Sequence, residues 1–138
     1  MQMNSGFRFG FIESNLVVMK RAARLAGWLL LAAIVFFSLS PASLRPMTPL
    51  GHTREHILVH VLLGLAFGIG YAKRWWLLAP GLVVLTGIIE IAQLFVPGRH
   101  ARLRDFLIDA GAACLGIGLA WIGTVVRSAL CSSAKSSP

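Results

Sequence analysis

Charged residues are scarce in this sequence, and acidic residues are the scarcest among them. Charged side chains make up 13% of the 138 residues, and only five residues are Asp or Glu. Soluble domains contain about 25% charged residues. Hydrophobic residues make up 57% of the chain, and a soluble domain of this size could not bury so much apolar surface. The composition therefore excludes an ordinary soluble domain and predicts an integral membrane protein.

Cysteine is also rare, and recognisable cofactor motifs are lacking. The two cysteines, Cys114 in an apolar run and Cys131 in a polar tail, exclude a disulfide framework. The chain contains neither a phosphate-binding loop nor a dinucleotide-binding motif, so we expect no cofactor. A net charge of +8 would suggest nucleic-acid binding in a soluble protein. Its distribution favours a membrane-topology signal instead, and we expect no nucleic-acid partner.

Four apolar stretches can form helices long enough to cross a membrane, although three of them must include ionisable residues to reach that length. The first lies between Arg24 and Arg45. The second reaches that length only if it includes His56 and His60, the third only if it includes Glu90, and the fourth only if it includes Asp109. The sequence thus predicts an all-α integral membrane four-helix bundle, with helices at about 22–39, 56–72, 75–95 and 106–126.

The two ends of the chain fall outside this membrane domain, which we place at residues 19–127. Residues 1–18 contain no span-length run, so a disordered leader and a translation start at Met19 both stay open. A cleaved signal peptide over Met19–Ala42 is disfavoured, because it would leave three helices. Residues 128–138 are rich in serine, and we expect a disordered tail.

Basic residues indicate the orientation of the helices. The connection at Lys73–Arg74 is so short that the second and third helices should form an antiparallel hairpin. Eight of the thirteen Lys and Arg residues lie at this turn or near the chain ends, and five lie in the other two loops. Because basic loops stay inside, we expect both termini in the cytoplasm. Small residues should allow close helix packing, and they are Gly64, Gly68, Ala112, Gly116 and Ala120.

Polar and ionisable residues gather at the outer loops and the adjoining helix ends. His60, Glu90 and Asp109 each lie about 5–8 Å inside a helix from the same side, so we expect them in one shallow layer. An unpaired charge in lipid costs roughly 2.5–3.5 kcal/mol, so these groups should face the bundle. Arg99 is the expected partner that keeps Glu90 ionised. The outer-face cluster, our candidate ligand-binding site, contains Arg54, His56, His60, Glu90, Gln93, Arg99, Arg102, Arg104, Asp105 and Asp109.

Three interpretations of this cluster compete. A buried carboxylate–guanidinium network could simply fix the helix register. A zinc site could use His56 and His60, which share one helical face, with Glu90 as a third ligand. The order of acid and histidines is not that of zincins, and nearby arginines repel a dication, so we expect no metal. Ligand binding is favoured, because packing four helices requires far fewer polar groups than the cluster contains.

Several short motifs resemble the VanZ-like family of small bacterial membrane proteins. The resemblance covers about residues 21–121, and the residues that carry it are Phe37–Pro41, His56, Glu90, Gln93, Pro97–Arg99, Asp105 and Gly111. It implies a multi-pass protein of the bacterial cytoplasmic (inner) membrane and the cell envelope. The family is associated with resistance to the glycopeptide teicoplanin, and no settled chemistry comes with it.

We therefore expect a protein that binds membrane lipids, with an anionic lipid or a lipid-linked envelope precursor held at the outer face. Arginine suits this role because its planar fork engages phosphate oxygens in pairs. The alternative is an intramembrane enzyme or transporter for a lipid-linked phosphate substrate, with His56 or His60 as general base. No activated nucleophile stands out, so the sequence favours binding over catalysis.

Overall fold

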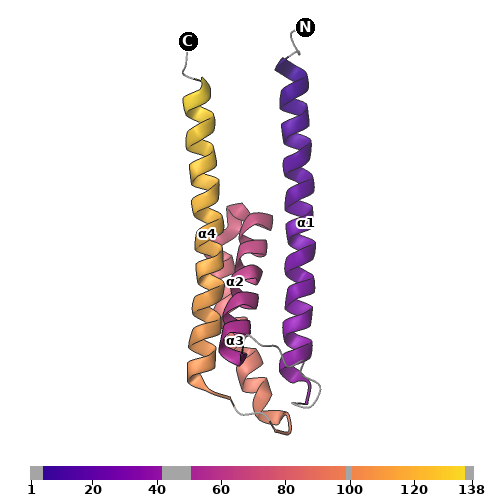
Figure 1. Cartoon of the computed structure of the whole chain (residues 1–138), viewed down its shortest axis with the longest axis vertical. Coiled ribbons are helices and arrows are strands. Elements are labelled where there is room, and N and C mark those ends of the chain that lie inside the picture. Colours follow the sequence, from indigo (N-terminus) through magenta and orange to yellow (C-terminus); the bar gives the residue numbers. More distant parts are fainter. Residues whose placement is uncertain (1–4, 42–50, 99–100, 136–138) are drawn as a thin grey trace.

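The computed structural model describes residues 5–41, 51–98 and 101–135, and all regular structure in these ranges is helical (Figure 1). Four long helices confirm the predicted all-α architecture, and two short 3-10 helices, labelled η, join or extend them. In chain order the elements are α1 (Ser5–Leu39), α2 (His52–Gly70), η2 (Ala72–Arg74), α3 (Trp75–Ala92), η3 (Gln93–Phe95) and α4 (Leu103–Lys135).

Three helical stretches within the described residues are long and apolar enough to cross a membrane, namely Ser14–Leu39, Ala72–Phe95 and Leu103–Leu130. This supports the predicted membrane protein. The α2 helix has 19 residues, but it is not among these candidate spans. Its first two turns contain Arg54, Glu55 and two of the chain's histidines, and these polar residues lower its hydropathy.

The outermost helices extend beyond their predicted bounds. The α1 helix begins at Ser5, not near residue 22, and α4 continues to Lys135 through residues expected to begin a disordered tail. The chain has no proline in positions 1–40 or 98–137, so nothing breaks either helix. The tail serines fit the helix, because the Ser128 hydroxyl donates to the Val125 carbonyl and the Ser132 hydroxyl to the Ala129 carbonyl.

The predicted hairpin is present, and η2 joins α2 directly to α3. The Arg74 N–H donates to the Tyr71 carbonyl at 2.8 Å and closes this turn. The start of α1 and the end of α4 lie at the same end of the bundle (Figure 1). The connection from α3 to α4 lies at the opposite end, so α4 runs parallel to α2.

The α2 and α4 helices pack closely against each other, and small residues predicted to allow close packing lie at this contact. A Cβ atom at Gly64 would collide with the carbonyl oxygen of Ala113, and one at Gly116 would collide with the carbonyl oxygen of Val61. A Cβ at Gly68 would lie 2.5 Å from the Ala120 side chain. Each glycine therefore admits a neighbouring backbone or methyl group that any larger residue would displace.

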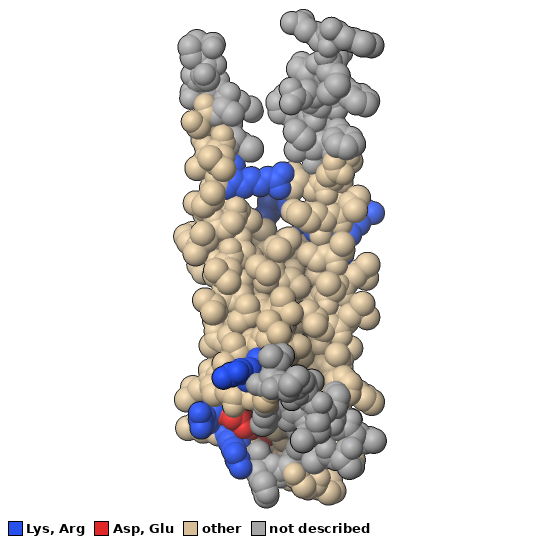
Figure 2. All heavy atoms as spheres, viewed as in Figure 1, with Lys and Arg blue, Asp and Glu red and all other residues tan. Residues whose placement is uncertain are grey.

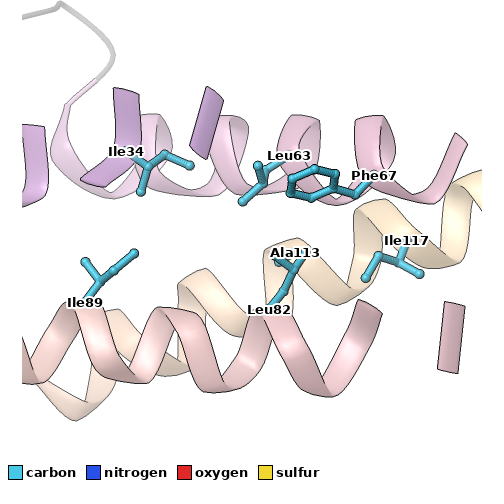
Figure 3. Close-up of a cluster of buried hydrophobic side chains, with 7 residues drawn as sticks. All are labelled: Ile34, Leu63, Phe67, Leu82, Ile89, Ala113 and Ile117. Atoms are coloured by element: carbon cyan, nitrogen blue, oxygen red, sulfur yellow. The ribbon is translucent and has the colours of Figure 1, made fainter. Parts of the chain in front are cut away.

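Apolar side chains from all four long helices meet between the helices (Figure 3). Leu63 is 1% exposed and Ala113 is fully buried, so the centre of this core lies at the contact between α2 and α4. The remaining members are Ile34, Phe67, Leu82, Ile89 and Ile117. Many other large apolar side chains are exposed, as expected for helices that face lipid.

Lysine and arginine side chains lie at two levels of the molecule, with a broad uncharged band between them (Figure 2). The acidic atoms visible in this view lie at the lower level, beside the start of α4. A broad apolar band with the charged residues confined to its two ends is typical of a membrane protein.

Candidate functional site

A cluster of two histidines and one aspartate joins the beginnings of α2 and α4. His56 Nδ1 lies 2.9 Å from Asp109 Oδ2 and 3.1 Å from Asp109 Oδ1. His60 Nδ1 lies 3.4 Å from Asp109 Oδ1. The two imidazole rings stack with their centroids 5.9 Å apart and their planes 21° from parallel. We call His56, His60 and Asp109 the His–Asp cluster.

Helix geometry explains how this cluster forms. His56 and His60 are four residues apart, so their side chains lie on one face of α2. One turn beyond His60, Gly64 lets the α4 backbone approach that same face. Asp109 on α4 is thereby carried to the two rings at the level predicted from its depth. The cluster is buried, with His60 3% exposed and Asp109 7% exposed.

Hydrogen bonds fix the two rings. His60 Nδ1 donates to the backbone carbonyl of His56 at 2.9 Å, one turn earlier in the helix. The Asp109 carboxylate is the partner of the His56 ring. The predicted layer is thus present for His60 and Asp109. The acid beside the histidines is Asp109, whereas the zinc hypothesis from the sequence names Glu90 as the third ligand.

Glu90 makes a separate contact near the end of α3. One of its carboxylate oxygens accepts a hydrogen bond from the backbone N–H of Arg102, the residue before α4 begins. Glu90 is 9% exposed and Gln93 is 7% exposed, so both face the bundle as predicted. The described partner of Glu90 is thus a backbone group, and Arg99, its predicted partner, lies outside the described residues.

The described arginines of the outer-face cluster surround these buried groups. Arg54, Arg102 and Arg104 are exposed, and Asp105 is half-buried. Asp105 lies in the first turn of α4, where a negative charge is favourable. In the described residues, the buried acids Glu90 and Asp109 thus contact a backbone N–H and imidazoles, where the sequence predicted a guanidinium network.

A second polar cluster, which the sequence did not predict, lies at the opposite end of the bundle. Arg24 Nε donates to the Gly70 carbonyl at 2.8 Å, and its guanidinium carbon lies 4.7 Å from the centre of the Tyr71 ring. Trp28 Nε1 donates to the Tyr71 hydroxyl at 3.2 Å. These contacts lie beside an apolar cavity of about 360 Å³, which Leu78 and Leu82 also line. In the sequence, the only feature that pointed to this second cluster was the spacing of Arg24 and Trp28, four residues apart on one predicted helix.

Comparisons of the chain with protein-family models, with curated proteins and with solved structures found no match. The resemblance to the VanZ-like family therefore stays a prediction from the motif residues, and the function must be inferred from the geometry of the site.

Proposed function

We propose that this protein binds an anionic lipid headgroup, or the phosphate of a lipid-linked envelope precursor, at the end where α2 and α4 begin. The observation that carries this proposal is the parallel arrangement of these two helices. Their N-terminal ends meet, and each end presents backbone N–H groups and a partial positive charge. A pair of such ends favours an anion.

The position of the arginines supports the same ligand. Arg54 lies in the first turn of α2 and Arg104 in the first turn of α4, with Arg102 just before it. A cation at a helix N-terminus opposes the helix dipole, so these residues do not stabilise their own helices. Their exposed guanidinium groups suit bidentate contacts with phosphate oxygens instead.

Native mass spectrometry of the purified protein with phosphatidylglycerol tests this proposal. We expect the combined change Arg54→Ala, Arg102→Ala and Arg104→Ala to weaken the tightest-bound lipid at least about tenfold, since each basic residue near a lipid surface contributes about 1 kcal/mol. The matched control is Arg21→Ala, Lys73→Ala and Arg74→Ala, which removes the same charge at the opposite end. Equal loss in both variants would contradict a specific site.

We also propose that this end faces outward and that both termini are cytoplasmic, in a bacterial inner membrane. The basic residues at Lys73–Arg74 and along α1 support this orientation. In a background with both native cysteines replaced by alanine, Arg104→Cys should react with a membrane-impermeant maleimide on intact cells. Lys73→Cys should react only after lysis. The reverse pattern would overturn the orientation.

A second candidate function has one specific observation in its favour. The Asp109 carboxylate contacts His56 Nδ1, the arrangement that orients a general base. In an enzyme or transporter for a lipid-linked phosphate, His56 would therefore serve as the general base, with Asp109 orienting its ring. Accumulation of one lipid-linked species in cells lacking the protein would favour this function. We also propose membership of the VanZ-like family, which the motif residues support.

A further inference from the structure

The His–Asp cluster contains two imidazoles and one carboxylate, the ligand types that first-row transition metals prefer. We propose that His56, His60 and Asp109 bind a divalent transition-metal ion, with Zn²⁺ as the ion that best fits the ligand set. This proposal goes beyond anion binding, because the ligands are different residues and the site lies beneath the exposed arginines.

The distances between the ligand atoms support a metal. One ligand atom from each of the three side chains lies within 4.8 Å of the other two. Asp109 Oδ1 lies 3.1 Å from His56 Nδ1 and 3.4 Å from His60 Nδ1. At a tetrahedral zinc with bonds of about 2.0–2.1 Å, neighbouring ligand atoms lie about 3.3 Å apart. The distances from Asp109 Oδ1 to His56 Nδ1 and to His60 Nδ1 are therefore already close to those between two ligands of one zinc ion.

The charge of the cluster points the same way. Asp109 is a buried carboxylate between two rings that are neutral in their ordinary metal-binding form. A buried carboxylate is costly unless it is paired or coordinates a metal. The hydrogen bond from the His56 ring offsets part of this cost, and a bound metal would offset more. A divalent cation at the centre would compensate this charge and bond to all three side chains.

The structure replaces the third ligand considered from the sequence and answers one of the two objections to a metal, the nearby arginines. The third ligand considered from the sequence was Glu90, but Glu90 contacts the Arg102 backbone. Asp109 is the acid beside the histidines and becomes the third ligand. The arginines expected to repel a dication have exposed side chains at Arg54, Arg102 and Arg104, whereas His60 and Asp109 are buried. The order of acid and histidines still excludes a zincin, so the proposal is a binding site alone.

The competing explanation is a hydrogen-bonded cluster that only fixes the helices. In it, His60 Nδ1 carries the proton that bonds to the His56 carbonyl. His56 Nδ1 likewise carries the proton that it donates to the Asp109 carboxylate. For either Nδ1 atom to ligate the metal, its proton must move to Nε2, which gives the other neutral tautomer of that ring. Metal binding and the hydrogen bond to the His56 carbonyl are therefore alternatives at the same nitrogen.

The test uses the full chain in lipid nanodiscs, stripped with a chelator and titrated with Zn²⁺ against a chromophoric competitor. We expect one Zn²⁺ per chain, no displacement by excess Mg²⁺, and at least about a tenfold loss of affinity in Asp109→Asn. The first control is Glu55→Gln, which removes an acid one residue before His56 on α2. The second combines His52→Asn with His100→Asn, the other two histidines of the chain. Both controls should bind as the wild type does.

Co²⁺ bound to the wild-type protein gives a readout that does not depend on folding of a variant. Strong visible absorption, typical of a tetrahedral site, would support the proposal. Weak absorption, typical of an octahedral aqueous ion, would contradict it. Failure of the wild type to retain Zn²⁺, undiminished affinity in Asp109→Asn, or loss of binding in either control would also overturn it. None of these outcomes depends on whether lipid binds at the arginines.

Discussion

Gly64→Ala is expected to destabilise the protein more than any other single methyl added to the helices. The new Cβ would overlap the backbone carbonyl of Ala113, which cannot rotate away as a side chain can. Overpacking typically costs about 1–3 kcal/mol, and a clash with backbone belongs at the upper end of that range. Gly116→Ala should behave in the same way, because its Cβ would meet the Val61 carbonyl and, at 2.7 Å, the Leu65 nitrogen.

Unfolding of the purified protein in a denaturing detergent, followed by circular dichroism, measures this effect. The matched control is Gly118→Ala, on the same helix as Gly116, where an added Cβ meets nothing within 4 Å. This control should be as stable as the wild type or slightly more stable, since alanine favours helix. Wild-type stability in Gly64→Ala would show that α2 and α4 do not pack as described.

The second large loss of stability is expected when a substitution removes the Glu90 carboxylate. In Glu90→Leu, the backbone N–H of Arg102 loses the oxygen that accepts its hydrogen bond. A fully buried donor left without a partner costs about 1–3 kcal/mol. Because this contact is part-buried, we expect a loss near the lower end of that range. Because Arg102 immediately precedes α4, the start of that helix should also lose order. Insertion into the membrane should not suffer, since removing a carboxylate lowers the cost of transfer.

Glu90→Gln separates the two properties of this side chain. The glutamine keeps an acceptor oxygen and the shape of the side chain but removes the charge. We therefore expect Glu90→Gln to stay within about 1 kcal/mol of the wild type in the same unfolding assay. Hydrogen exchange at residues 101–106 should rise in Glu90→Leu alone. Equal destabilisation in both variants would show that the charge, and not the acceptor, stabilises this contact.

The fold was predictable where apolar runs and charges alternate clearly. The gaps between charged residues predicted the four long helices, and the short Lys73–Arg74 connection predicted the hairpin. The bounds at the two ends were not predictable, because serine-rich or weakly apolar segments carry no strong stop signal without proline. Continuation of α4 through Ser128 and Ser132 depends on hydroxyl bonds to the preceding turn, which composition alone does not reveal.

The sequence predicted the depth of the site in the bundle but not which of its side chains contact one another. Spacing placed His56 and His60 on one face, and depth placed His60, Glu90 and Asp109 at one level. Which acid meets the histidines depends on the rotation of each helix about its axis. That rotation is set by Gly64 and Gly116 at the contact between α2 and α4, and a sequence pattern shows only that these glycines favour close packing.

The central claim is that an anionic headgroup binds where α2 and α4 begin. The most direct measurement is photo-crosslinking with a phospholipid that carries a diazirine on its headgroup, followed by mass spectrometry of the crosslinked peptides. We predict that the most abundant crosslinks lie within residues 51–56 and 101–109 and that unlabelled phosphatidylglycerol competes them away. Crosslinks concentrated at residues 71–77, at the opposite basic end, would contradict the account.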